Sequence, residues 1–315
     1  MIRSAGRDIR SLTVPQTFAW GIGLALVTAL ISGVSIFVNG FAVKQLPDAA
    51  VFTTLKNGVA AVLLIALAAA AVRPADLRTV TRRSWGWLLV IGIVGGSVPF
   101  VLFFSGLAQA SAPSAAFIQK TLFIWVAILA VPLLGERLGG LQVVALGVLL
   151  AGQALILAPV GIAWGPGETM IAAATLLWAV EAILAKRVLR SVPAPIVGAA
   201  RLGFGLVVLV GYLGVSGKLG IVAALSAEQW RWALITGLLL TGYVATWFAA
   251  LKRAPASVVT AVLVVGAPVT AGLQAIQAGT VVVGPVAIGQ LLVLVAGAAL
   301  VATALRRRAP ASVTA

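Results

Sequence analysis

Long apolar runs separated by short polar connections follow one another along the whole sequence. Each run is about 20 residues long, the length that a helix needs to cross a bilayer. The short alternating segments typical of barrel strands are not seen. We therefore predict an all-α integral membrane fold with ten transmembrane helices, at residues 18–40, 50–72, 85–107, 114–134, 141–160, 168–186, 195–216, 232–250, 258–277 and 285–304.

The composition agrees with this pattern and excludes several kinds of chemistry. The 315 residues are 62% hydrophobic and 9% charged, whereas soluble domains have about 25% charged residues. The chain has no cysteine and no histidine, so thiol nucleophiles and thiolate or imidazole metal sites are excluded. No phosphate-binding loop of the G-x-x-x-x-G-K-[ST] type is present. We predict neither a cofactor nor a metal.

The formal net charge is +15, but the basic residues form small groups between the apolar runs. This distribution indicates membrane topology, and we predict no nucleic-acid partner. With both termini in the cytoplasm, 16 of the 22 basic residues fall in cytoplasmic segments and three on the other side, at Lys44, Lys218 and Arg231. The first run is longer than the apolar part of a signal peptide, so we expect an uncleaved span in a bacterial inner (plasma) membrane.

An internal repeat emerges when the first half of the sequence is aligned with the second. Residues 104–107 then fall on 248–251, and moving the alignment by one further position brings Lys56 onto Arg201. We predict a cytoplasmic segment at 1–17, five-helix repeats at 18–160 and 161–304, and a cytoplasmic tail at 305–315. Because five is odd, the second repeat must be inverted relative to the first, an arrangement common in secondary transporters.

Three short patterns resemble the EamA-like branch of the drug/metabolite transporter superfamily. They are Leu134-Gly-Glu-Arg-Leu138 after the fourth span, and Pro47 to Lys56 and Pro193 to Arg201 at the starts of the second helices of the two halves. The second half has no counterpart of Glu136 around 279–281, and Lys56 stands where an arginine is usual. The resemblance implies export or exchange of small metabolites through a cavity between the halves.

We therefore predict a secondary transporter, with no enzymatic activity, that moves a small organic metabolite, amino-acid-like or anionic, by alternating access. The alternative is a flippase or scaffold of the same fold that acts on a lipid or a lipid-linked head group. The seven acids are spread singly, which argues against an enzyme. The expected partners are the solute and the bilayer. The sequence leaves open whether transport is coupled to a proton or a sodium ion. It also leaves open whether the protein is a monomer or a homodimer.

Four ionisable residues lie well inside the predicted spans, where an unpaired charge costs about 2.5–3.5 kcal/mol on insertion scales. Depth groups Lys56 with Lys120, and Glu181 with Arg201. We predict a Glu181–Arg201 ion pair, either as a structural clamp or with a direct role of Glu181 in binding solute or a proton. Because Lys56 falls on Arg201 in the repeat, a basic helix-end role is favoured for it over solute binding.

Lys120 has no acid at its own depth. Its neighbours along a continuous helix include Ala116 and Ala127, so it could face a cavity. Solute contact, bonding to backbone carbonyls and snorkelling to the interface are the three alternatives. The full set of candidate solute contacts is Lys120, Gln119, Trp125, Trp178, Glu181, Tyr243 and Trp247, with packing as the alternative for the aromatic residues. Glu136 is expected in a solvated interfacial turn.

Overall fold

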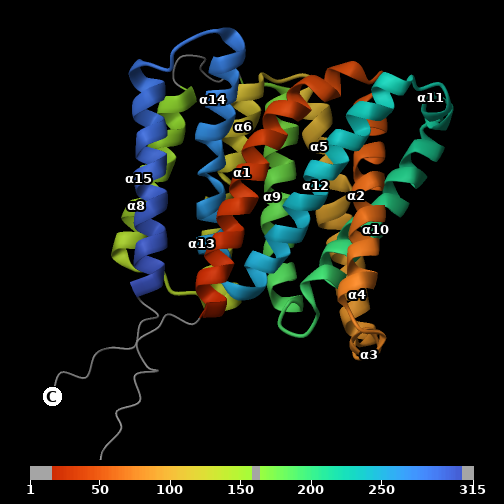
Figure 1. Cartoon of the computed structure of the whole chain (residues 1–315), viewed down its shortest axis with the longest axis horizontal. Coiled ribbons are helices and arrows are strands. Elements are labelled where there is room, and N and C mark those ends of the chain that lie inside the picture. The colour runs from red at the N-terminus through yellow and green to blue at the C-terminus, as the bar shows by residue number, and fades with distance from the viewer. Residues whose placement is uncertain (1–15, 158–163, 307–315) are drawn as a thin grey trace, which may run out of the picture.

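The computed structural model describes residues 16–157 and 164–306, and every regular element in these two stretches is a helix (Figure 1). Most of the predicted segments 1–17 and 305–315 lies outside the described residues. The helices are α1 (Gln16–Gln45), α2 (Ala49–Ala71), α3 (Pro74–Arg78), α4 (Arg82–Gly96), α5 (Val98–Leu107), α6 (Ala112–Lys120), α7 (Leu122–Leu134), α8 (Gly140–Leu157), α9 (Pro166–Val188), α10 (Ala194–Val215), α11 (Leu219–Ala223), α12 (Ala227–Arg253), α13 (Ala256–Leu263), α14 (Gly266–Ala278) and α15 (Gly284–Arg306).

Nine segments of the described chain are long and apolar enough to cross a membrane, and α8 is a shorter apolar helix. Three of the nine consist of two helices each, namely α4 with α5, α6 with α7, and α13 with α14. With α8 included, the described chain passes through the bundle ten times. The predicted all-helical membrane fold, with its ten spans in two repeats, is confirmed.

Local sequence signals set many of the helix ends. The carboxylate of Asp48 accepts hydrogen bonds from the first backbone N–H groups of α2, at 2.8 Å from Ala50 N and 3.1 Å from Val51 N. Ser226 and Gln229 form a reciprocal capping box at the start of α12. These polar residues satisfy backbone groups where the chain leaves the apolar layer, which holds the helix ends in place.

The repeat is visible in where the helices start and stop. The start of α6, the end of α7 and the start of α8 are all separated from their counterparts in α13, α14 and α15 by one constant offset along the chain. Gly135 and Gly279, which correspond under the same offset, end α7 and α14 in the left-handed conformation, with φ of 69° and 63°. The helical interruption at Thr121, between α6 and α7, corresponds to the one at Val265, between α13 and α14.

The helices pack as pairs related by this repeat. One contact occurs twice: α1 packs along α12, and its counterpart α9 packs along α4 and α5. In two other pairs a helix packs on its own counterpart, α2 on α10 and α8 on α15. In Figure 1, α1 begins and α15 ends on the same side of the bundle, which we call the terminal face. The other side, where α2, α9 and α12 begin, is the opposite face. Because α6 and α13 begin on different faces, the two repeats run in opposite directions.

Candidate functional site

A central cavity of about 100 Å³ lies between the two repeats, among α1, α2, α5, α6, α9, α10, α12 and the end of α13. Lys56 and Arg201 line it. Six of the seven predicted solute contacts do so too: Gln119, Lys120, Trp178, Glu181, Tyr243 and Trp247. The structure thus brings residues from five different spans of both repeats to one place.

The predicted partners Glu181, on α9, and Arg201, on α10, lie next to each other with Arg201 Nε 3.5 Å from Glu181 Oε1. Both side chains are buried, and the guanidinium lies 5.4 Å from the centre of the Phe100 ring. Glu181 Oε1 and two nitrogens of Arg201 make no hydrogen bond with described protein groups. The pair therefore balances its charge but keeps unused hydrogen-bonding capacity at the cavity.

Gly95 on α4 allows this pair to form. A Cβ atom at Gly95 would lie 3.0 Å from Arg201 Nε and closer still to Glu181 Cγ, well inside van der Waals contact. The carbonyl of Gly95 also accepts a hydrogen bond of 3.1 Å from Trp178 Nε1. One glycine thus leaves room for the ion pair and orients an aromatic wall of the cavity.

Lys56 has a different environment, although it corresponds to Arg201 in the repeat. Its ammonium lies 3.8 Å from the centre of the Phe104 ring and 5.2 Å from that of Phe100. Cation–π attraction to these rings stabilises the charge, and no acid among the described residues pairs with it. The depth argument separated Lys56 from Arg201, but both cations contact Phe100 because their long side chains reach one centre from both repeats.

Lys120 is the last residue of α6 and is only 4% exposed, which argues against snorkelling. Its ammonium donates hydrogen bonds to Ser32 Oγ at 3.1 Å and to the carbonyl of Leu263 at 3.4 Å. Leu263 ends α13, so this carbonyl belongs to a helix end that lies inside the bundle. The bonding of Lys120 to a backbone carbonyl thus coexists with its position on the cavity wall.

The sequence reasoning missed part of the polar lining. Ser35 and Asn39 on α1, like Gln119 on α6, line the central cavity and have a buried oxygen without a hydrogen-bond partner among described protein groups. With Ser32 they recur along α1 at intervals of three and four residues, which places them on one helix face. That polar stripe in an apolar run was the signal that could have revealed them.

Trp125 is the one predicted contact that lies away from the cavity. Its side chain is 40% exposed and is not part of the lining of the central cavity. Trp125 comes five residues after Lys120, which is about 140° around a helix axis. It faces outward on α7.

Glu136 does not lie in a solvated turn, as the sequence led us to expect. Its carboxylate accepts hydrogen bonds from the backbone N–H groups of Ala256, at 2.6 Å, and Ser257, at 3.0 Å, and from the Ser257 hydroxyl. It thus caps the start of α13, where unpaired N–H groups and the helix dipole favour an anion. The segment between α7 and α8 of the first repeat is thereby bonded to the second repeat on the terminal face.

Other bonds join the repeats and spans on the same face. Lys186 donates to the carbonyls of Leu251 and, at 2.7 Å, Ala254. Arg187 Nη2 donates to the carbonyl of Leu133 at 2.6 Å. These contacts tie the ends of α7, α9 and α12 to one another on the terminal face.

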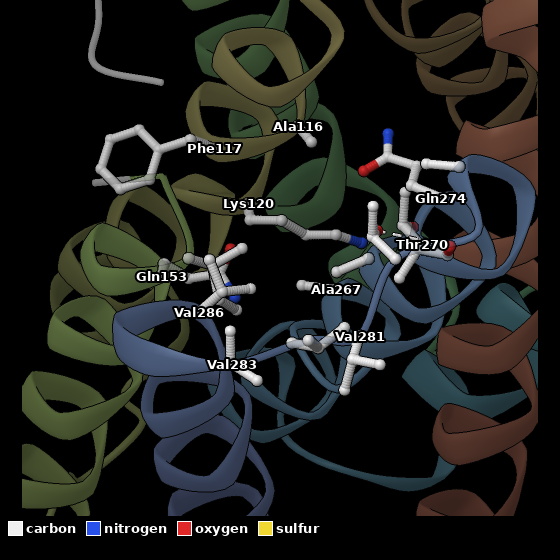
Figure 2. Close-up of a pocket in the computed structure, with 16 residues that line it drawn as sticks. Ala116, Phe117, Lys120, Gln153, Ala267, Thr270, Gln274, Val281, Val283 and Val286 are labelled. Carbon is white, nitrogen blue, oxygen red and sulfur yellow. Dashed lines mark hydrogen bonds between the residues drawn. The ribbon is translucent and has the colours of Figure 1, made fainter. Parts of the chain in front are cut away.

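A second, peripheral cavity of about 360 Å³ lies toward the opposite face, among α6, α8, α14 and α15 (Figure 2). Lys120 and Ala116 line both cavities. Lys120 therefore stands between the central cavity and a larger space near the opposite face.

Ten passes in two inverted repeats, with a polar cavity between them, define a multi-pass membrane protein of transporter architecture. The model of the EamA-like transporter family matches residues 19–158 and 165–308, so the chain belongs to this family. An uncharacterized transporter, sll1164, of a Synechocystis species is 28% identical over an alignment of 207 residues that covers 60% of this chain and 59% of that protein. A solved crystal structure superposes on 92% of this chain and 99% of its own with a TM-score of 0.75 at 18% identity, a likeness of fold. The family match therefore indicates a membrane transporter, and the solved structure adds a likeness of fold alone.

Proposed function

We propose that the protein is a secondary transporter that exports or exchanges a small organic metabolite, amino-acid-like or anionic, through the central cavity. The observation that carries this proposal is the charge of the cavity wall. Lys56, Lys120 and Arg201 face it with Glu181 as the one carboxylate among the described lining residues. An anionic group on the solute would offset this positive excess in a site of low dielectric.

The unused hydrogen-bonding groups support a polar solute. Glu181 Oε1, Asn39 Oδ1 and Gln119 Oε1 can accept hydrogen bonds, so an ammonium or hydroxyl group could bind beside them. Tyr243 and Trp247, stacked with ring centres 6.1 Å apart, provide an apolar wall for the rest of the molecule. A carboxylate near Lys120 and an amine near Glu181 is the amino-acid-like pattern.

The two inverted repeats support alternating access as the mechanism. The proposal assigns closure of the terminal face to the contacts of Glu136, Lys186 and Arg187, whereas the peripheral cavity lies toward the opposite face. The proposal takes the terminal face as cytoplasmic in a bacterial inner membrane, because the basic groups at the ends of α9 and α12 lie there. Glu181 is the candidate for coupling to a proton.

Solute uptake into proteoliposomes tests the proposal. Candidates are first ranked by the thermal shift of the purified protein with amino acids, organic acids, sugars and nucleosides, since a ligand of the folded state raises its apparent stability. We expect an amino acid or organic anion to be transported, and Trp247→Ala to lower uptake by about tenfold or more through loss of a cavity wall. Trp20→Ala, at an exposed position of α1, is the matched control with normal uptake.

The same vesicles distinguish the flippase alternative. A fluorescent phospholipid in one leaflet reports lipid flipping independently of any added solute. Lipid movement that needs the protein, together with no uptake of any water-soluble candidate, would overturn the proposed function. Solute uptake that Trp247→Ala leaves intact would contradict the central cavity as its route.

A further inference from the structure

The peripheral cavity combines a charged base with apolar walls. Figure 2 shows Lys120 extending across it, with Gln153 on the side of α8 and Gln274 on that of α14. The remaining wall includes Phe117, Val283 and Val286. Its volume of about 360 Å³ lies within the range of about 300–1,000 Å³ that is usual for small-molecule sites.

Two buried polar groups in this cavity have unused hydrogen-bonding capacity. The ammonium of Lys120 uses two of its three N–H donors on Ser32 and Leu263, and no described acceptor receives the third. Gln153 is 4% exposed, and its Nε2 has no partner among the described groups. Burying donors without acceptors is costly, so both groups favour a ligand that brings an acceptor.

The charge of the cavity wall favours an anionic ligand. Lys120 is the one charged side chain among the described residues that line the peripheral cavity. An acceptor group with a negative charge gains both a hydrogen bond and a Coulombic attraction there, whereas a cation is repelled. The valines and Phe117 form an apolar wall that suits an apolar part of the ligand. Valine side chains cannot form hydrogen bonds, so this wall does not favour a polar part there.

We propose that the peripheral cavity is a binding site for a water-soluble organic anion with an apolar body, such as a medium-chain carboxylate. The carboxylate binds between Lys120 and Gln153, and the chain lies against Phe117, Val283 and Val286. This site shares Lys120 and Ala116 with the central cavity but extends from them toward α8, α14 and α15, and binding there needs no transport. Ala275 and Tyr243 each line one of the two cavities, so variants at these residues separate this inference from the proposed function.

Octanoate binding to the full chain in phosphatidylcholine nanodiscs tests the site. We expect octanoate to bind at least about tenfold more tightly than octanol or octylamine, because only the anion pairs with Lys120. Shortening the carboxylate should weaken binding by about fourfold per methylene. Lys120→Gln should weaken octanoate binding by about tenfold, and Gln153→Leu by a smaller factor.

Blocking variants locate the bound anion. Ala275 lines the peripheral cavity, and Ala275→Trp fills it, so octanoate binding should be lost. Ile276→Trp, at the next residue of α14 but 78% exposed on its outer side, is the matched control and should bind octanoate normally. Tyr243→Ala alters the central cavity alone and should also leave octanoate binding unchanged.

Three results would overturn the proposal. Equal affinity for octanoate, octanol and octylamine would show that the charge of Lys120 selects nothing. Equal effects of Ala275→Trp and Ile276→Trp would show that the cavity is not the site. Loss of octanoate binding in nanodiscs that contain an anionic phospholipid, at constant ionic strength, would assign the site to a lipid head group instead.

Discussion

The two repeats share a backbone plan but differ at the positions that carry charge. Arg201 in the second repeat pairs with Glu181, whereas Lys56, its counterpart in the first repeat, lies on aromatic rings. Glu136 caps α13 across the repeats, whereas its counterpart Thr280 donates through its hydroxyl to Ala275 within its own segment. The two repeats thus share the positions at which helices start and break. The residues that differ between the repeats determine which groups each charged or polar side chain bonds.

The cap that Glu136 makes on α13 has no equivalent at the start of α6, the counterpart of α13 in the first repeat. Glu136 accepts from the N–H groups of Ala256 and Ser257. The equivalent positions at the start of α6 are 112 and 113, and residue 113 is proline, which has no N–H. The first turn of α6 is instead capped by its own Ser111, which accepts from Ser114 N at 3.2 Å. The opposite face therefore has neither the counterpart acid nor one of the two N–H donors, and it lacks this cap between the repeats.

The largest expected effect separates the two symmetry-related cations. Arg201→Met leaves the Glu181 carboxylate buried without a cation, and the apparent free energy of unfolding should fall by about 3–5 kcal/mol. Lys56→Met removes a charge that has no acid partner. The variant loses the cation–π attraction, but it also removes the free-energy cost of burying the ammonium, and the two effects offset each other. Its effect should stay below about 1 kcal/mol, within the usual range for a cation–π contact. Titration with denaturing detergent in mixed micelles measures both.

A charge swap is the control for that comparison. The double variant Glu181→Arg with Arg201→Glu keeps one charge of each sign in the same place. We expect it to recover much of the stability that each single change loses. Equal destabilisation by Arg201→Met and Lys56→Met, or no recovery in the swap, would contradict a structural difference between the two cations.

The next effect concerns the glycine that makes room for the pair. Gly95→Ala places a methyl group inside van der Waals contact with Glu181 Cγ and should cost about 1–3 kcal/mol, as overpacking does. In the second repeat the counterpart of Gly95 is Leu240, a large side chain that lines the same cavity. Gly86→Ala, in the same helix α4 with no neighbour within 4 Å of the new methyl group, is the matched control. If both substitutions have the same effect in the detergent titration, the close approach at Gly95 is not what matters.

A smaller effect is expected at the two helix caps. Glu136→Ala should lower the free energy of unfolding by about 0.5–2 kcal/mol, the usual cost of losing a cap, whereas Thr280→Ala should leave it nearly unchanged. The chain has no cysteine, so Ser35→Cys gives a single thiol in the central cavity. An impermeant thiol reagent added from the terminal face should label it faster in Glu136→Ala than in Thr280→Ala. Equal rates would show that the Glu136 cap does not close that face.

The spans and their order could be predicted because a chain in a bilayer must satisfy its backbone groups within helices, so run length alone identifies them. The central site was largely predictable for a related reason, since buried charges such as Lys120 and Glu181 avoid lipid. The breaks were not. The helices are interrupted at Thr121 and Val265, and neither of these residues is a proline or a glycine. The hydrogen bond of Lys120 to Leu263 at the end of α13 forms only through tertiary packing. The cap made by Glu136 also depends on such contacts, which no single segment contains.

The smallest expected effect lies at the opposite face, where Lys218 Nζ is 2.7 Å from Asp48 Oδ2. Burial raises the pKa of Asp48, but hydrogen bonds from Lys218, Val51 N and Ala50 N outweigh it, and its pKa lies below the usual value. The hydrogen bond to Asp48 raises the pKa of Lys218. A lowered carboxyl pKa stabilises the fold above the unfolded value of about 4, and this contribution is lost as the pH falls through the folded pKa.

Asp48→Asn isolates this charge, because asparagine can still cap α2. At pH 7 the variant should have a slightly lower melting temperature than the unaltered protein, since a partly exposed pair contributes less than about 1 kcal/mol. The gap should close as the pH falls from about 4 through the lower folded pKa of Asp48, below which Asp48 is uncharged in both the folded and the unfolded chain. A gap that stays constant from pH 7 to pH 3 would show that the two repeats are not joined by this ion pair at the opposite face, and the Glu136 cap would then have no charged counterpart there.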